Sequence, residues 1–203
     1  MLRAIASALF RCRLQVLSIF LTYVLSSAIG ILMVHAGSHF ALSQRDKIVG
    51  HANATEPAAL SEQAGEHVTA AIQDFAANVF RGAIPQTLLG LGVIPPYVSA
   101  AYQGWVGGIV SVDGRHQSRL ARLSTASYYL TVLLLQFIPF SLAIGAGVRA
   151  GLDLYFHNAS VGWKLWQYKA PRSTLEGLAA CYIVAVPLFL LASVVEYLWP
   201  WSR

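Results

Sequence analysis

The stretch GVIPPYVSAAYQGWVGG, residues 92–108, lies inside a run of 31 residues, Gly82 to Val112, that contains no Asp, Glu, Lys or Arg. A single straight helix of that length would measure about 46 Å, whereas the hydrocarbon core of a bilayer is about 30 Å thick. Pro95 and Pro96 each lack a backbone N–H, and Pro96 disfavours helical geometry at the residue before it. We therefore expect the chain to turn at this proline pair, with a helical arm on either side.

The composition of the whole chain is typical of a membrane protein. Of its 203 residues, 56% are hydrophobic and only 11% are charged, whereas soluble domains carry about 25% charged residues. The mean hydropathy is +0.56. We predict an all-α, multi-pass transmembrane bundle that forms one membrane domain over residues 1–203. Its five spans are expected at about 14–35, 76–94, 96–112, 124–148 and 175–198.

Basic residues ahead of the first span indicate its orientation. Arg3, Arg11 and Arg13 precede the apolar segment and favour a cytoplasmic N-terminus. The tripeptide at residues 34–36, VHA, resembles a signal-peptide cleavage site, but the apolar segment is longer than the usual signal core of about 7–15 residues. We expect the segment to be retained as a membrane span.

The longest polar part of the chain follows the first span, as an extramembrane segment over residues 36–74. Thr55 can cap a helix there, and Glu56 and Pro57 suit its first turn. We predict an amphipathic helix that lies along the outer membrane surface between spans 1 and 2. Its apolar face would be formed by Leu60, Ala64, Val68, Ile72, Phe75 and Val79.

The two basic connectors leave the number of spans open. Residues 113–122 and residues 149–175 both carry several Arg or Lys residues, so the positive-inside rule favours the cytoplasm for both. One additional span lies between them, so they fall on opposite sides of the membrane. Five spans place the longer connector inside, whereas four spans, with residues 82–112 as one irregular crossing, place the shorter one inside. Charge alone does not decide between the two topologies.

Small residues recur at intervals of four in two of the expected spans. This spacing places them on one helix face, where another backbone can approach closely. We therefore predict helix-packing faces at Ala100, Gly104 and Gly108 and at Ala143, Gly147 and Gly151.

Polar side chains within the spans are the second class of candidate functional residue. Arg81 and Glu196 are expected at a similar depth in the second and fifth spans, and we hypothesise that they form an intramembrane ion pair. The alternative is that Arg81 extends to the lipid headgroups and Glu196 faces water. Interhelical hydrogen bonds are expected from Asn78, Gln103 and Gln136, and an interfacial aromatic belt from Tyr197, Trp199 and Trp201.

The sequence offers no set of residues that is typical of catalysis. It lacks the Gly-x-Ser-x-Gly, phosphate-loop and HExxH patterns, and its two cysteines lie in no metal or redox motif. His35 and His39 have a spacing that can bind a metal on a helix, but no third ligand is near them in sequence. We expect no enzymatic activity, cofactor or metal. The net charge of +5 comes from residues that flank the spans, so we expect contact with lipid headgroups and not with nucleic acid.

Three stretches resemble the stage II sporulation protein M family of small multi-pass membrane proteins. They are FAANVFRGAIP from Phe75, AYQGWVGGIVS from Ala101 and QFIPFSLAIGAGVRAG from Gln136, and the last span with Pro187 and Glu196 is also similar. The resemblance covers the chain from Phe75 onward. The chain departs from the family ahead of the proline in the fourth span, because Gln136 stands where members often carry a Glu and the His of their His-Gly pair is missing. A titratable role at this position is therefore not implied.

The resemblance implies five spans in the bacterial cytoplasmic (inner) membrane, with the N-terminus in the cytoplasm. It also implies a scaffold that holds the enzymes of a peptidoglycan-remodelling complex. We therefore expect a non-catalytic subunit that assembles with other integral membrane proteins, with lipids and with further copies of itself as candidate partners. The alternative is a permease-type component of an ABC-like exporter or a small channel. Its coupling helix would lie at residues 157–172, with Trp163, Trp166 and Tyr168.

Overall fold

The computed structural model describes residues 2–157 and 171–199, and the regular elements in these ranges are all helices, with no β-strand. Three of its helices are long and apolar enough to cross a membrane: α1 (Leu2–His35), α7 (Leu123–His157) and α8 (Arg172–Leu198). The prediction of an all-helical membrane protein is confirmed at this level.

The apolar run of residues 82–112 contains parts of two separate helical rods. The first rod is continuous through α4 (His67–Ala76), the π-helical segment η1 (Ala77–Ala83) and α5 (Ile84–Gly90). The second is α6 (Pro95–Ile109). The predicted first arm, 76–94, thus has different bounds: helical structure begins nine residues earlier, at His67, and ends at Gly90.

The chain turns over residues 91–94, just before the proline pair. Val93 lies in the left-handed region, with φ of 65°, which ends the preceding rod. Pro95 and Pro96 begin α6, because a residue in the first helical turn needs no backbone N–H donor. The expected break is present, and the prolines start the second helix instead of forming the turn itself.

The polar segment after α1 folds as two helices, α2 (His39–Thr55) and α3 (Pro57–Gln63), before α4 begins. The prediction of one amphipathic helix through this region was wrong. The helix is interrupted at Gly65, whose φ of 81° suits a glycine and ends a helix. Thr55 is the last residue of α2, and Glu56 occupies the N-cap position of α3.

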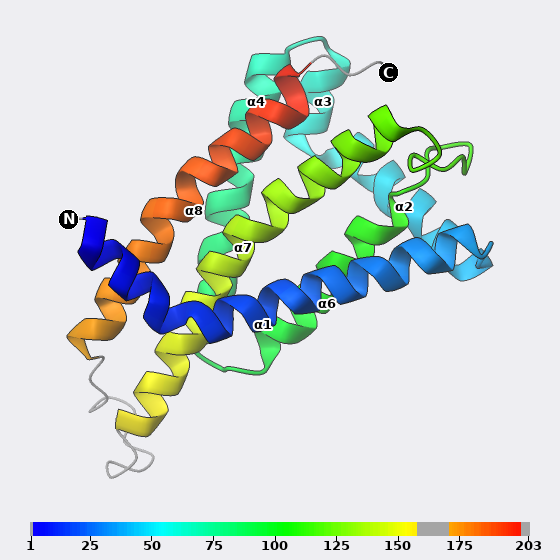
Figure 1. Cartoon of the computed structure of the whole chain (residues 1–203). Helices are drawn as coiled ribbons and strands as arrows, with labels where there is room; N and C mark the ends of the chain where they lie inside the picture. Colours follow the sequence, from blue (N-terminus) through cyan, green and yellow to red (C-terminus); the bar gives the residue numbers. More distant parts are fainter. Residues whose placement is uncertain (1, 158–170, 200–203) are drawn as a thin grey trace.

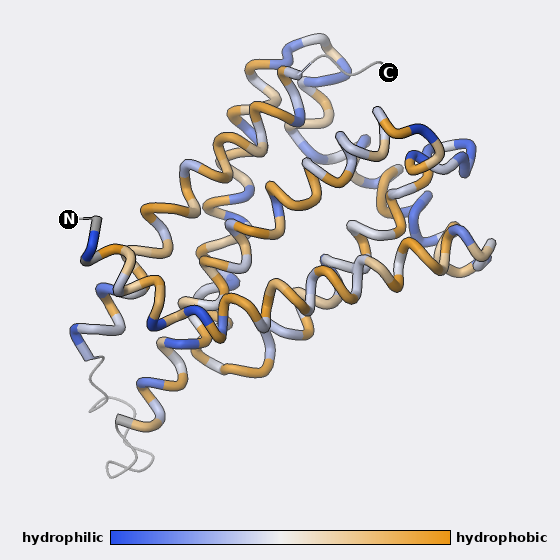
Figure 2. Tube along the Cα trace, in the orientation of Figure 1, coloured by the Kyte–Doolittle hydropathy of each residue, from blue (hydrophilic) through white to orange (hydrophobic). Residues whose placement is uncertain are grey.

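The long rods alternate in direction (Figure 1). Helices α1, α6 and α8 run one way, and the α4–α5 rod and α7 run the other way. The first end of the bundle contains the 91–94 turn and the end of α7. The second end contains α2, α3, the loop over residues 110–122 and the end of α8 (Figure 1). Figure 2 shows hydrophilic residues concentrated in α2, α3 and this loop, whereas the long helices are mainly hydrophobic.

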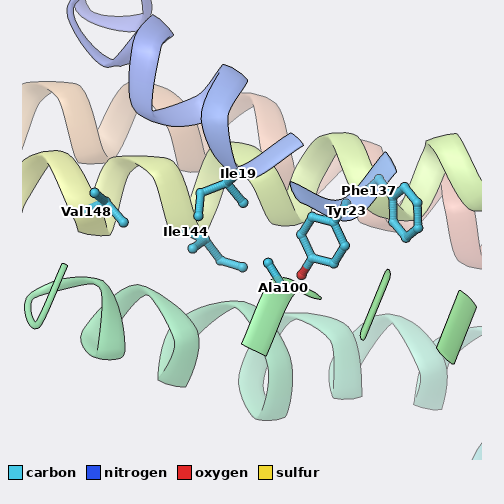
Figure 3. Close-up of a cluster of buried hydrophobic side chains, with 6 residues drawn as sticks. All are labelled: Ile19, Tyr23, Ala100, Phe137, Ile144 and Val148. Carbon is cyan, nitrogen blue, oxygen red and sulfur yellow. The ribbon is translucent and has the colours of Figure 1, made fainter. Parts of the chain in front are cut away.

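A cluster of buried side chains joins α1, α6 and α7 in the middle of the bundle (Figure 3). The rings of Tyr23 and Phe137 stack with their centroids 4.8 Å apart. We call this group the central apolar cluster. Its members are Ile19, Tyr23, Ala100, Phe137, Ile144 and Val148.

Glycines allow backbone-to-backbone contact at two helix pairs. Between α1 and α6, a Cβ added at Gly30 would lie 2.5 Å from the carbonyl oxygen of Trp105. Between α5 and α7, a Cβ added at Gly90 would lie 2.6 Å from the carbonyl carbon of Gly147. A real Cβ atom does not approach other atoms this closely, so any larger residue would force the helices apart.

Candidate functional site

A cavity of about 1000 Å³ lies at the second end of the bundle, between α3, α4, α7 and α8. We call it the polar cavity. A neighbouring cavity of about 600 Å³ shares part of its wall. The residues common to both cavities are Asn53, Glu62, Asp74, Val110, Glu196 and Tyr197.

Two carboxylates from facing helices lie on this shared wall. Asp74, on α4, accepts hydrogen bonds through Oδ2 from Asn78 Nδ2 at 2.9 Å and from Ser193 Oγ at 2.7 Å. Glu196, on α8, accepts a hydrogen bond through Oε2 from Gln136 Nε2 at 3.2 Å. Ser193 and Glu196 are three residues apart on α8, and therefore point to the same side of that helix.

The predicted ion pair between Arg81 and Glu196 does not form. Arg81 instead pairs with Glu56, with 3.2 Å between Nη2 and Oε2, and both side chains are half exposed. Glu196 is held by Gln136, an amide that was predicted to bond across helices. Arg81 lies in the π-helical segment η1, and both Arg81 and Glu196 line the neighbouring cavity.

The wall of the polar cavity carries more negative than positive groups. Among the described residues, its lining includes the carboxyl groups of Asp74 and Glu196 and one guanidinium, that of Arg119, which is exposed. Within residues 2–157 and 171–199, neither Asp74 nor Glu196 forms an ion pair with Arg or Lys. Both carboxyl groups are partly buried. The cavity therefore holds two acidic side chains in a setting that is only partly screened by water.

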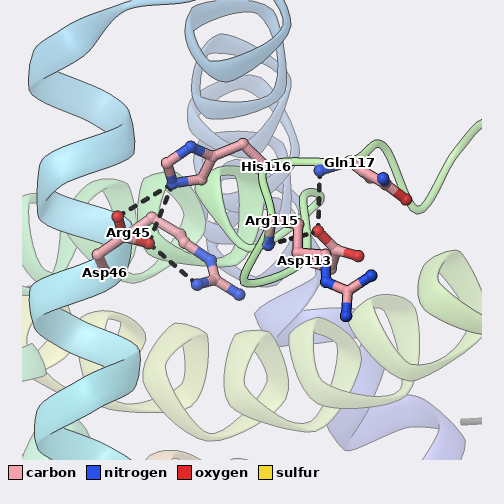
Figure 4. Close-up of polar contacts among 6 residues, drawn as sticks. All are labelled: Arg45, Asp46, Asp113, Arg115, His116 and Gln117. Carbon is pink, nitrogen blue, oxygen red and sulfur yellow. Dashed lines mark hydrogen bonds and ion pairs between the residues drawn. The ribbon is translucent and has the colours of Figure 1, made fainter.

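The loop over residues 110–122 contributes to the lining of the polar cavity, and polar contacts hold this loop in place (Figure 4). Asp113 accepts hydrogen bonds from the backbone N–H groups of Gln117 and Arg115, both at 2.8 Å, and they lower the pKa of Asp113. His116 Nε2 lies 3.0 Å from Asp46 Oδ2 on α2. This second contact fastens the loop to α2.

The floor of the polar cavity is apolar. Leu133 lines the cavity and also packs against the central apolar cluster. Tyr129 lines the cavity as well, and its hydroxyl donates a hydrogen bond to the carbonyl oxygen of Gly107 on α6. The cavity is thus bounded by packed side chains on the side that faces the middle of the bundle.

The predicted small-residue faces lie where helices meet. Gly104 and Gly108 contact the backbone of α1 near Tyr23 and Gly30. Gly147 and Gly151 contact α5 and the residue that follows it, through the carbonyl oxygens of Thr87 and Leu91. Ala100 is completely buried in the central apolar cluster, and Ala143 is completely buried beside α4–α5 and α8.

The remaining predicted site residues have separate roles. Asn78 bonds within its own rod, whereas Gln103 bridges α6 and α1 by accepting a hydrogen bond from the Tyr23 hydroxyl at 2.8 Å. Tyr197 lines the polar cavity, and Trp199 is 64% exposed. Other residues named above lie outside the described ranges: Trp163, Trp166, Tyr168 and Trp201.

Histidine and acidic side chains do not gather into a metal site. Over the residues that the structure describes, no group of three or more His, Cys, Asp or Glu side chains is arranged to hold a metal ion. His35 Nε2 instead lies 2.7 Å from Ser118 Oγ, and so joins the end of α1 to the loop over residues 110–122.

Sequence reasoning missed several polar residues that join helices, and Thr87 is one of them. Thr87 Oγ1 lies 2.7 Å from the Tyr182 hydroxyl on α8 and donates to the carbonyl oxygen of Ala143 on α7 at 3.0 Å. Ser193 is another. Neither residue type stands out in an apolar span, because Ser and Thr can bond to their own helix backbone.

Comparison with known proteins does not assign the chain to a family. No family model matches it, and neither a curated protein nor a solved structure does.

Proposed function

We propose that this chain is a non-catalytic subunit of the bacterial inner membrane that helps to assemble or stabilise a larger membrane complex. The observation that carries the proposal is the closed packing of the bundle between its two ends. Backbones touch through glycines at α1–α6 and at α5–α7, and the central apolar cluster fills the space between α1, α6 and α7. A body packed in this way suits the role of a rigid partner.

We further propose that the protein crosses the membrane five times, with the N-terminus in the cytoplasm. The alternating directions of the five rods support this topology, because successive crossings must alternate. The α4–α5 rod has 24 residues, or about 36 Å, which suffices for a crossing. Helix α6 has 15 residues, about 22 Å, so this crossing is short and calls for local thinning of the bilayer or for its continuation to Val112.

The transport alternative needs a polar path between the two ends of the bundle. The polar cavity offers an entrance, but the central apolar cluster lies between it and the first end. This packing favours assembly over transport. The resemblance to the stage II sporulation protein M family supports the same role, and it names a peptidoglycan-remodelling complex as the class of assembly.

Photo-crosslinking in intact membranes tests the proposal. A crosslinking amino acid would replace Leu25 on α1, which is 64% exposed, and Ala143 would serve as the buried control position. We expect a discrete adduct with another integral membrane protein from position 25 and none from position 143. Mild-detergent purification should then recover that protein at a fixed ratio. A chain that purifies alone and forms no adducts contradicts the proposal. Co-purification of an ATPase at a fixed ratio would instead support the transport alternative.

A further inference from the structure

We propose that the polar cavity binds a primary ammonium group, R–NH₃⁺, the chemistry shared by a free organic amine and an ethanolamine lipid headgroup. This binding role is independent of the proposed assembly role. It rests on the hydrogen-bonding groups that the cavity wall leaves available and on the balance of charge around them.

One acceptor on the wall is buried without a donor among the described residues, and two carboxylates lie beside it. The described hydrogen bonds of Asp74 and Glu196 are accepted by Oδ2 and Oε2, and no described residue donates to Oδ1 or Oε1. Gln136 donates from Nε2 to Glu196, and its own Oε1 is buried without a hydrogen-bond partner. A buried acceptor without a donor is costly, so the arrangement calls for a ligand that brings N–H groups.

An ammonium group supplies the missing chemistry. It carries three N–H donors and no acceptor, and its positive charge suits two partly buried carboxyl groups that form no ion pair with a described Arg or Lys residue. A divalent metal fits less well, because the described residues offer no cluster of three or more metal-binding side chains. Arg119 does not fill this role, because its guanidinium is exposed and forms no ion pair with either carboxylate.

The rest of the cavity suits the organic part of such a ligand. Its volume of about 1000 Å³ lies at the upper end of the range for small-molecule sites. Tyr128, Tyr129 and Tyr197 contribute aromatic rings to the wall, and aromatic faces attract cations. The cavity lies among the polar elements of the second end, α3 and the loop over residues 110–122.

The proposal is tested by measuring ligand binding to the full chain in nanodiscs of phosphatidylglycerol, a lipid that has no amine. Ligand-observed NMR would compare ethanolamine with ethylene glycol, its neutral counterpart. We expect saturable binding of ethanolamine only, weakened at least tenfold by Asp74→Asn and by Glu196→Gln. Glu176→Gln, which removes a half-exposed carboxylate that lines neither cavity, should leave the affinity unchanged. Thermal unfolding of each variant establishes that it is folded.

Native mass spectrometry separates the two sources of the ammonium group. From nanodiscs of equal phosphatidylethanolamine and phosphatidylglycerol, preferential retention of phosphatidylethanolamine, lost in both variants, identifies the lipid headgroup as the ligand. Saturable ethanolamine binding without lipid preference identifies a free amine. The proposal is overturned if neither binds, if ethylene glycol binds equally well, or if the folded Asp74→Asn and Glu196→Gln proteins bind as the unchanged chain does.

Discussion

Gly108 illustrates what single residues contribute to this bundle. Its Cα is so close to α1 that an added Cβ would lie 2.9 Å from the Cα of Gly30 and would also overlap the Ser27 carbonyl oxygen. The spacing of Ala100, Gly104 and Gly108 in the sequence predicts that this face packs closely. The identity of the facing helix is not readable from the same pattern, because every apolar span offers a surface of similar chemistry.

Replacing Gly108 by Ala should destabilise the protein by about 1–3 kcal/mol, because α6 and α1 must separate to admit the methyl group. Thermal unfolding in a mild detergent measures the effect. Gly50→Ala is the matched control, since Gly50 lies within α2 with nothing near its Cβ position. That change should instead stabilise the protein by about 0.5–1 kcal/mol. Equal effects of the two substitutions would contradict close packing of α1 on α6.

Thr87→Val should destabilise the bundle by roughly 0.6 kcal/mol, and by less than about 1.7 kcal/mol, because it removes one interhelical hydroxyl while keeping the side-chain shape. Tyr182→Phe should act in the same way. The double variant should lower the free energy of unfolding by less than the sum of the two single changes. Thr131→Val is the control, because its hydroxyl donates only within its own helix. Strictly additive effects would show that Thr87 and Tyr182 do not interact.

Among the helical elements, the junctions differ most from the sequence-based expectation. The apolar spacing from Leu60 to Val79 is that of one helix, yet Gly65 divides it and the α4–α5 rod begins at His67. Periodicity does not register such a break, because α3 and α4 each keep their own helical spacing. By contrast, the break at the proline pair follows from local stereochemistry, and this is why it was predictable.

The contact between α2 and the loop over residues 110–122 should weaken in acid. Arg45, and next His116, hold the pKa of Asp46 below its usual value of 3.8. A carboxyl whose pKa is lowered by folding stabilises the folded contact above the unfolded pKa, and this contribution is lost as the pH falls through the folded value. We therefore expect a held loop at neutral pH and a loosened loop below about pH 3.8.

Hydrogen exchange over residues 110–122, corrected for the intrinsic effect of pH, measures this change. In Asp46→Asn the loop should exchange rapidly both at neutral pH and below about pH 3.8. Lys47→Gln should behave like the unchanged chain. A loop that is equally protected in Asp46→Asn and in the unchanged protein would show that Asp46 does not hold it.

For the whole molecule, composition and apolar length are enough to predict a helical membrane protein, and the structure contains three helices that are long and apolar enough to cross a membrane. The polar cavity is not predictable in the same way. Glu196 was singled out, but Asp74 meets Ser193 and Glu196 only because α4 and α8 run side by side. Contacts between residues more than one hundred positions apart leave no local mark on a single sequence. The partner of Arg81 likewise depends on the packing of the helices, which places Glu56 and not Glu196 beside it.

The central claim is that five rods cross the membrane and that the 91–94 turn lies on the cytoplasmic side. Cysteine labelling tests it most directly, in a chain whose buried Cys12 and Cys181 are replaced by Ala. Ile94→Cys, at a side chain that is 72% exposed, should react with a membrane-impermeant maleimide only from the cytoplasmic side. Gly50→Cys should react only from the opposite side. Labelling of both positions from the same side, or protection of residue 94 from both sides, would contradict the five-crossing topology.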